Sequence, residues 1–152
     1  MASLSKDRLN PTITDTNMWE HFAHQADIGI RASGGSLNEA FEDAALALTA
    51  IITELKNIDA VESVQIKCSG ENAELLLVNW LSSIIYEMDV RKMLFGRFEV
   101  SLEKLKLSAT IWGEKINQQK HSPAVEPKAV TYNQLSVKNE KGKWIVQCVV
   151  DV

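Results

Sequence analysis

The chain has few cysteines, prolines and glycines, no long apolar run and no excess of positive charge. Its 152 residues include two cysteines, three prolines and seven glycines, which excludes a collagen-like fibre or a low-complexity chain. No apolar run approaches the roughly 20 residues that a membrane-spanning helix needs, so no membrane association is expected. Sixteen basic residues against twenty acidic ones leave a net charge of −4 without a basic cluster. Strong direct binding to nucleic acid is therefore not expected either.

The cysteines and the N-terminus indicate a cytoplasmic protein. Cys68 and Cys148 lie in apolar or alternating runs, and neither has a close Cys or His partner. We expect reduced, half-buried core thiols rather than zinc ligands. The first 17 residues are polar and lack the apolar segment of a secretory signal. The predicted organisation is a flexible N-terminal extension over residues 1–17 and one domain over residues 18–152.

What is present is typical of a globular domain, with 45% apolar and 24% charged residues. Alternating polarity predicts strands within residues 19–33 and 61–68, and apolar residues three and four apart predict helices over 37–55 and 72–89. From residue 93 onward the period of two predicts about five further strands, the first two joined in a hairpin near residues 103–104. This order favours a single α+β domain, a largely antiparallel or mixed β-sheet with two amphipathic helices packed on it. No Gly-rich phosphate-binding motif follows a strand.

Acidic groups interrupt the first strand and end the last one. Asp27 stands inside a strand pattern, where Asp is depleted, so it marks either a turn or bulge or a binding group. Asp151 and the carboxylate of Val152 end the chain and by themselves fit a solvated terminus. Because the first and last strands of a small domain often lie close together, the three groups could form an all-oxygen cluster. Such a cluster suits a hard divalent cation such as Ca²⁺ or Mg²⁺.

The remaining polar side chains also have ordinary explanations. Lys128 precedes a strand and is either solvated or directed at an acidic or phosphate group of a partner. His121 lies in a polar loop and is expected at the surface. His21 and His24 are three residues apart on a strand, which points them to opposite faces and makes a poor metal pair. No nucleophile and base are related by a supporting spacing, so no catalytic residue is predicted.

Five short segments, in this order and spacing, resemble the archease family, small proteins that activate the RtcB-type RNA ligase of tRNA splicing and RNA repair. They are residues 24–29 (HQADIG), 75–81 (LLLVNWL), 112–114 (WGE), 128–132 (KAVTY) and 149–152 (VVDV). The resemblance runs from about Trp19 to the end of the chain. It implies an α+β fold and a divalent metal ion, typically Ca²⁺, held by Asp27, Asp151 and Val152. It also implies a functional lysine at Lys128.

The resemblance further implies an accessory protein rather than an enzyme. Archeases help the ligase to become guanylylated by GTP and to turn over repeatedly, and a chaperone-like role has also been suggested for the family. His24 is a further residue near the implied site. Two positions depart from the family pattern, since Gln25 replaces a usual Thr and Asn133 a common His. Neither is an implied ligand, although Gln25 could alter hydrogen bonding near Asp27.

Our hypothesis is that Asp27, Asp151 and Val152 form an acidic tip that enters the metal-containing active site of the ligase, with Lys128 offsetting charge there. A stand-alone metal-dependent hydrolase is one alternative, and it would need a positioned base and an open metal position. A general chaperone or interaction module is another, and it should expose an apolar patch. Trp112, on the polar side of its strand, is the one indication of such a surface. The sequence leaves the physiological metal, the oligomeric state, the ligase contact surface and the RNA substrates open.

Overall fold

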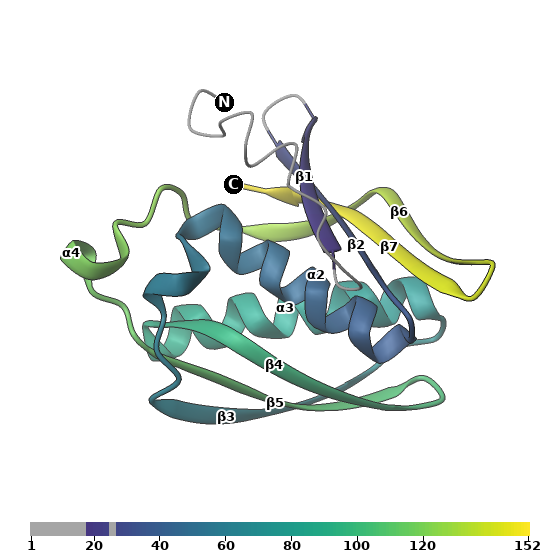
Figure 1. Ribbon diagram of the computed structural model, residues 1–152, viewed down its shortest axis with the longest axis horizontal. Helices are drawn as coiled ribbons and strands as arrows, with labels where there is room; N and C mark the ends of the chain where they lie inside the picture. The colour runs from purple at the N-terminus through teal and green to yellow at the C-terminus, as the bar shows by residue number, and fades with distance from the viewer. Residues whose placement is uncertain (1–17, 25–26) are drawn as a thin grey trace.

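The computed structural model describes residues 18–24 and 27–152, with the side chains of these residues except those of residues 23 and 24. The extension expected over residues 1–17 lies outside the described residues. Two antiparallel β-sheets form the outer layers and two long helices lie between them (Figure 1). The α+β class is confirmed, with the strands divided between two sheets rather than gathered in one.

The first sheet joins both ends of the domain. Its strands are β1 (Met18–His24), β2 (Asp27–Gly34), β7 (Lys143–Asp151) and β6 (Ala129–Glu140), in this spatial order. All neighbouring strands are antiparallel. The stretch expected to form one strand is a hairpin of β1 and β2, and Asp27 is the first residue of β2, paired with His24. Asp27 therefore begins a strand and does not interrupt one, which accounts for an Asp in this pattern without excluding a role in binding.

The second sheet has three strands in the order β3 (Glu62–Ser69), β5 (Lys106–Lys115) and β4 (Met93–Glu103). The expected hairpin near residues 103–104 is confirmed, with Lys104 at a φ of 57° in the turn. A register shift between Phe95 and Arg97 brings the backbone of β4 against Gly113. A Cβ atom at Gly113 would lie 1.8 Å from the carbonyl oxygen of Leu94, so only glycine fits there.

Both predicted helices are present, as α2 (Leu37–Ile52) and α3 (Ala73–Arg91), with short turns of helix at η1 (Leu55–Asn57) and α4 (Gln118–His121). The Ser36 hydroxyl accepts a hydrogen bond from the Glu39 N–H at 3.2 Å and begins α2. The Asn72 side chain caps α3 in the same way at the Leu75 N–H, at 2.8 Å. Helix α2 ends three residues before the predicted residue 55, because the chain turns into η1 there.

One apolar core fills the space between the layers. Its largest fully buried side chains come from both sheets and both helices: Ile28, Ile30, Phe41, Leu48, Ile51, Leu76, Leu77, Trp80, Leu81, Ile84, Phe95 and Ile111. Cys68 is half-buried and Cys148 fully buried, and both are free thiols. Burial raises the pKa of Cys148 to about 12, which leaves that thiol unreactive. Among the described residues, no helix combines the length and apolarity needed to cross a bilayer.

Candidate functional site

Sheet register brings the two predicted aspartates together. Strands β2 and β7 pair antiparallel, and Ile28 lies opposite Val150 at this end of the ladder. Asp27 and Asp151 each stand one residue further along, so the register places them opposite each other. Opposed side chains in antiparallel strands share one face, with Cβ atoms about 4.5–5.5 Å apart. Two half-exposed carboxylates from the two ends of the domain therefore meet.

The aspartates face away from the helices. Ile28 and Val150 belong to the core between the layers, and alternate residues along a strand point to opposite faces. On the outer face, the Phe22 ring covers Gly29, where a Cβ atom would lie 2.2 Å from the ring. The Arg31 guanidinium lies 4.8 Å from the centre of the same ring. The aspartates therefore lie beside a closely packed aromatic patch.

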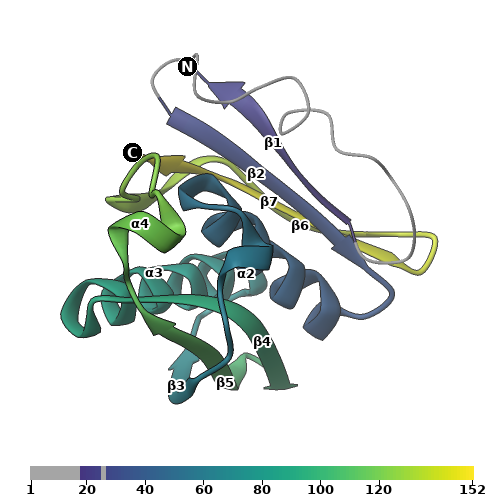
Figure 2. The same ribbon diagram turned by 60° about the vertical axis from the view of Figure 1, so that its left-hand side comes forward.

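Lys128 stands at the same end of the sheet, one residue before β6 begins. Its backbone N–H donates to the Asp151 carbonyl at 2.8 Å, and the next residue, Ala129, pairs with Asp151. The Lys128 side chain is exposed. Val152 packs against the core and fixes the end of the chain here, and Figure 2 shows the C-terminus beside the beginning of β2.

The predicted donor set fits a hard cation. Asp27, Asp151 and the terminal carboxylate offer only oxygen atoms, which Ca²⁺ and Mg²⁺ prefer. Like charges directly opposite on a sheet destabilise the pair, so a cation between them would relieve that repulsion. Within the described part of the chain, no three His, Cys, Asp or Glu residues form a metal-binding group. In the predicted set, the carboxylate of Val152 would be the third donor. The His24 side chain lies outside the described part, so its role stays a prediction.

His121, expected at the surface, is buried, with 2% of its area exposed. The Asn117 N–H donates to its Nδ1 atom at 2.9 Å, so Nδ1 carries no proton. Its Nε2 N–H then donates to Glu114 at 3.0 Å. Glu114 also accepts hydrogen bonds from the Lys120 ammonium group and the Asp59 N–H. These bonds, the Lys120 bond foremost, lower the pKa of Glu114 to about 2.

This network anchors the loop that carries Lys128. The Thr53 hydroxyl donates to the His121 carbonyl, and the Ala124 N–H donates to the Ile52 carbonyl at 2.8 Å. Residues 117–124 are thus attached to the end of α2, four residues before Lys128. The sequence did not predict that His121 is buried and bonded to Glu114. The polar residues around it are those of a surface loop, and their spacing gives no sign of burial.

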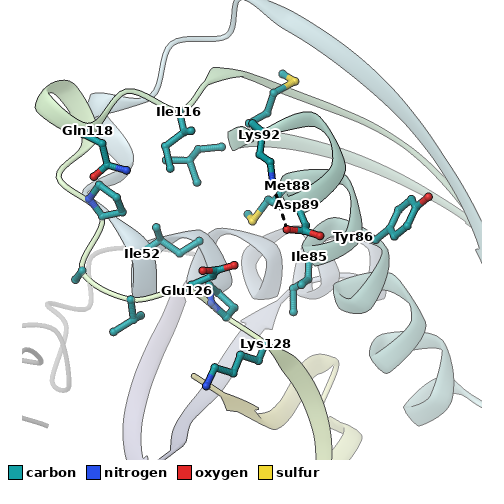
Figure 3. A pocket seen from close by; sticks show the side chains of 16 residues that line it. Ile52, Ile85, Tyr86, Met88, Asp89, Lys92, Ile116, Gln118, Glu126 and Lys128 are labelled. Carbon is teal, nitrogen blue, oxygen red and sulfur yellow. Dashed lines mark ion pairs between the residues drawn. The ribbon is translucent and has the colours of Figure 1, made fainter.

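A pocket of about 680 Å³ lies between this loop and the C-terminal half of α3 (Figure 3). Apolar side chains form most of it, among them Ile52, Ile85, Met88, Leu94, Ile116 and Val125. Asp89 and Lys92 form an ion pair of 3.6 Å at its edge. Lys128 lies at one end, and its side chain points away from the other labelled side chains. Lys128 therefore lines the pocket at this end, with its side chain directed out of it.

Trp112, the one indication of an exposed apolar surface, is covered from within the molecule. It is half-buried on the outer face of β5, and the Arg97 guanidinium lies 4.4 Å from the centre of its ring. This cation–π contact accounts for a tryptophan on a polar face.

Comparisons with known proteins agree with the resemblance seen in the sequence. The model of the Archease protein family (MTH1598/TM1083) matches residues 19–152. Protein archease of Pyrococcus abyssi is 40% identical over 139 residues, covering 88% of this chain and 98% of its own. Protein archease of Sulfurisphaera tokodaii is 38% identical over 136 residues, with the same coverage.

Two solved structures share the fold. The solution structure of protein 1598 of Methanobacterium thermoautotrophicum superposes with a TM-score of 0.79 at 31% identity, over 88% of this chain and 98% of that one. The crystal structure of an archease of Thermotoga maritima, described as a possible chaperone, gives a TM-score of 0.61 at 22% identity, over 86% and 94%.

Proposed function

The chain belongs to the archease family, and we propose that it activates an RtcB-type RNA ligase, promoting guanylylation by GTP and repeated turnover in tRNA splicing and RNA repair. The observation that supports the proposal is that the register of β2 and β7 sets Asp27 opposite Asp151, with Lys128, one residue before β6, bonded through its backbone N–H to Asp151. Two carboxylates and a lysine at one exposed end suit contact with the metal ions and phosphates of another protein's active site.

The tip would hold a divalent ion, Ca²⁺, Mg²⁺ or Mn²⁺, through Asp27, Asp151 and the Val152 carboxylate. When bound, the ion supplies a concentrated positive charge that polarises phosphate oxygens. The two aspartates present ligand oxygens outward, on the face away from the helices. Lys128 offers a positive charge beside them, suited to a triphosphate or to acidic metal ligands of the ligase.

An accessory role fits this chain better than a stand-alone hydrolase. A hydrolase needs a base that can reach a bound substrate. The two ring nitrogens of His121 are engaged by Asn117 and Glu114 inside the protein, which leaves that imidazole no free atom for substrate. The free thiols Cys68 and Cys148 suit the reducing cytoplasm, where we place the protein.

The test is ligation of an RNA with 3′-phosphate and 5′-hydroxyl ends by limiting cognate ligase, with GTP and a divalent ion. We expect the protein to change a single turnover into many, and Asp27→Ala, Asp151→Ala and Lys128→Ala to abolish the gain. Asp89→Ala and Lys138→Ala, which remove the same charges at exposed positions, are the matched controls. Unchanged product with a ligase that can be guanylylated would show the proposal to be wrong. If the protein and its Asp27→Ala and Asp151→Ala variants equally prevent unrelated proteins from aggregating, a general chaperone would be favoured instead.

A further inference from the structure

The two outer edges of the three-stranded sheet differ. The edge of β4 is closed by side chains of α2. Asn38 donates to the Val100 carbonyl at 3.1 Å, and the Val100 N–H donates to the Glu42 carboxylate at 2.8 Å. Further along, the Thr49 hydroxyl donates to the Phe95 carbonyl at 2.7 Å. These bonds satisfy backbone groups that would otherwise pair with another strand.

The edge of β3 is open. Strand β3 pairs only with β5 in its sheet and lies at the lower margin of Figure 1. The Gly70 N–H donates to the Leu105 carbonyl at 3.1 Å, which identifies the even-numbered residues of β3 as those bonded to β5. The backbone N–H and C=O groups of Gln65 and Lys67 therefore point outward. No described residue bonds to them, whereas the next outward carbonyl, that of Ser69, accepts from the Asn79 side chain at 2.7 Å.

There is room for a strand beside this edge. A groove of about 570 Å³ separates β3 from α3. The wall on the side of α3 is formed by Asn79, Ser82, Ser83, Tyr86 and Glu87. Hydroxyl and amide groups there can bond to polar side chains, and the Tyr86 ring, 63% exposed, offers an apolar contact. An extended polypeptide lying in such a groove can form main-chain hydrogen bonds with the unpaired backbone groups of the edge strand.

The charge along the edge specifies the segment further. Lys67 is opposite Ser108, and Ser69 is opposite Lys106, so the two lysines lie diagonally on the outer face. Both are exposed, and within the described part of the chain neither forms an ion pair. An acidic side chain opposite Lys67 would be stabilised by this pair of cations.

We propose that the open edge of β3 binds an extended segment of the ligase as an added strand, bonded to the backbone of Gln65 and Lys67 and bearing an acidic residue opposite Lys67. The identity of the partner rests on the proposed function. The edge also begins at the end of the molecule that carries the α4 loop, since Lys120 of α4 pairs with Asp59, three residues before β3, at 2.7 Å.

The test compares Lys67→Pro with Lys67→Ala. Both remove the charged side chain, but only proline removes the outward N–H, and edge positions tolerate proline because that N–H is not part of the ladder. We measure the dissociation constant of the cognate ligase at fixed salt and divalent ion. We expect Lys67→Pro to bind about tenfold more weakly than Lys67→Ala, from one lost hydrogen bond and the bulk of the ring. In the wild-type chain, ligase should slow hydrogen exchange at the Gln65 and Lys67 amides.

The exchange measurement needs no variant, so the proposal stays testable if Lys67→Pro does not fold. Equal affinities of the two variants and no amide protection would overturn strand addition. Loss of activation in Asp27→Ala would then leave the proposed function standing. If the wild-type chain neither binds nor activates the ligase, the proposed function is wrong. The proposal that the ligase binds at this edge is then wrong as well. A wild-type dimer that Lys67→Pro turns into a monomer would assign the edge to a second copy and overturn the proposal.

Discussion

Replacing Asp43 by asparagine is expected to remove a loss of stability that the protein suffers as the pH rises from 4 to 7. Asp43 lies on the buried face of α2 with 3% of its area exposed. Burial, reinforced by the nearby Glu42 and Glu39, raises the pKa of this carboxyl to about 7, although a hydrogen bond from the Met18 N–H opposes the shift. Its Oδ2 atom has no hydrogen-bond partner among the described residues.

The sign and size of the effect follow from the shift. The folded protein keeps the Asp43 proton up to about pH 7, while the unfolded chain loses it near the ordinary value of 3.8. The carboxyl therefore stabilises the fold fully below that ordinary value, and the contribution is lost as the pH rises through about 7. A shift from 3.8 to about 7, at 1.36 kcal/mol per pKa unit, corresponds to on the order of 4 kcal/mol.

The assay is urea unfolding of the wild type and of Asp43→Asn at pH 5 and pH 8. Between pH 5 and pH 8, the Asp43 carboxyl should lower the unfolding free energy of the wild type by on the order of 3 kcal/mol, and this decrease should be absent from Asp43→Asn. The amide keeps an acceptor for the Met18 N–H but buries an unpaired donor, which costs about 1–3 kcal/mol at every pH. Glu54→Gln, at an exposed position, is the control. A difference in unfolding free energy between wild type and Asp43→Asn that is the same at both pH values would refute the reasoning.

Three further predictions concern the tip and its surroundings. Residues added after Val152 should abolish stabilisation by Ca²⁺ in thermal unfolding, while the same tag at Met1 should not; equal stabilisation would exclude the terminal carboxylate as a ligand. Gly29→Ala should lower the free energy of unfolding by about 1–3 kcal/mol, because its Cβ atom would lie 2.2 Å from the Phe22 ring, and a second change, Phe22→Leu, should recover part of the loss. The lowered pKa of Glu114, about 2, contributes stability above the ordinary value of 4.5 that is lost as the pH falls through 2, so Glu114→Gln should flatten acid unfolding; an unchanged acid profile would contradict this.

Much of the secondary structure was predictable from local patterns. Apolar residues three and four apart located α2 and α3 to within a few residues. Alternation located the β4–β5 hairpin and its turn. These features depend on neighbours in the chain, whose backbone preferences and hydrogen bonds act without reference to distant segments.

The candidate site was predictable as a list of residues but not as an arrangement. Asp27 stood out inside a strand pattern, Asp151 at the end of the last strand and Lys128 before a strand. The register of β2 and β7 then set the two aspartates opposite each other, and the register of β6 and β7 brought the Lys128 backbone to the same end of the sheet. A slip of one residue between β2 and β7 would have put the two aspartates on opposite faces of the sheet. Packing of Ile28 and Val150 on the helices selects the observed register, because the slip would expose them.

The sequence by itself determined the helices, the hairpin, the α+β class and the identity of the acidic groups and Lys128 as candidates. Only the tertiary structure decided the division into two sheets, the burial of His121 on Glu114 and the contrast between the closed edge of β4 and the open edge of β3. The first set follows from the conformational preferences of short segments. The second depends on which apolar faces pack together across the chain, and that packing is a property of the whole core.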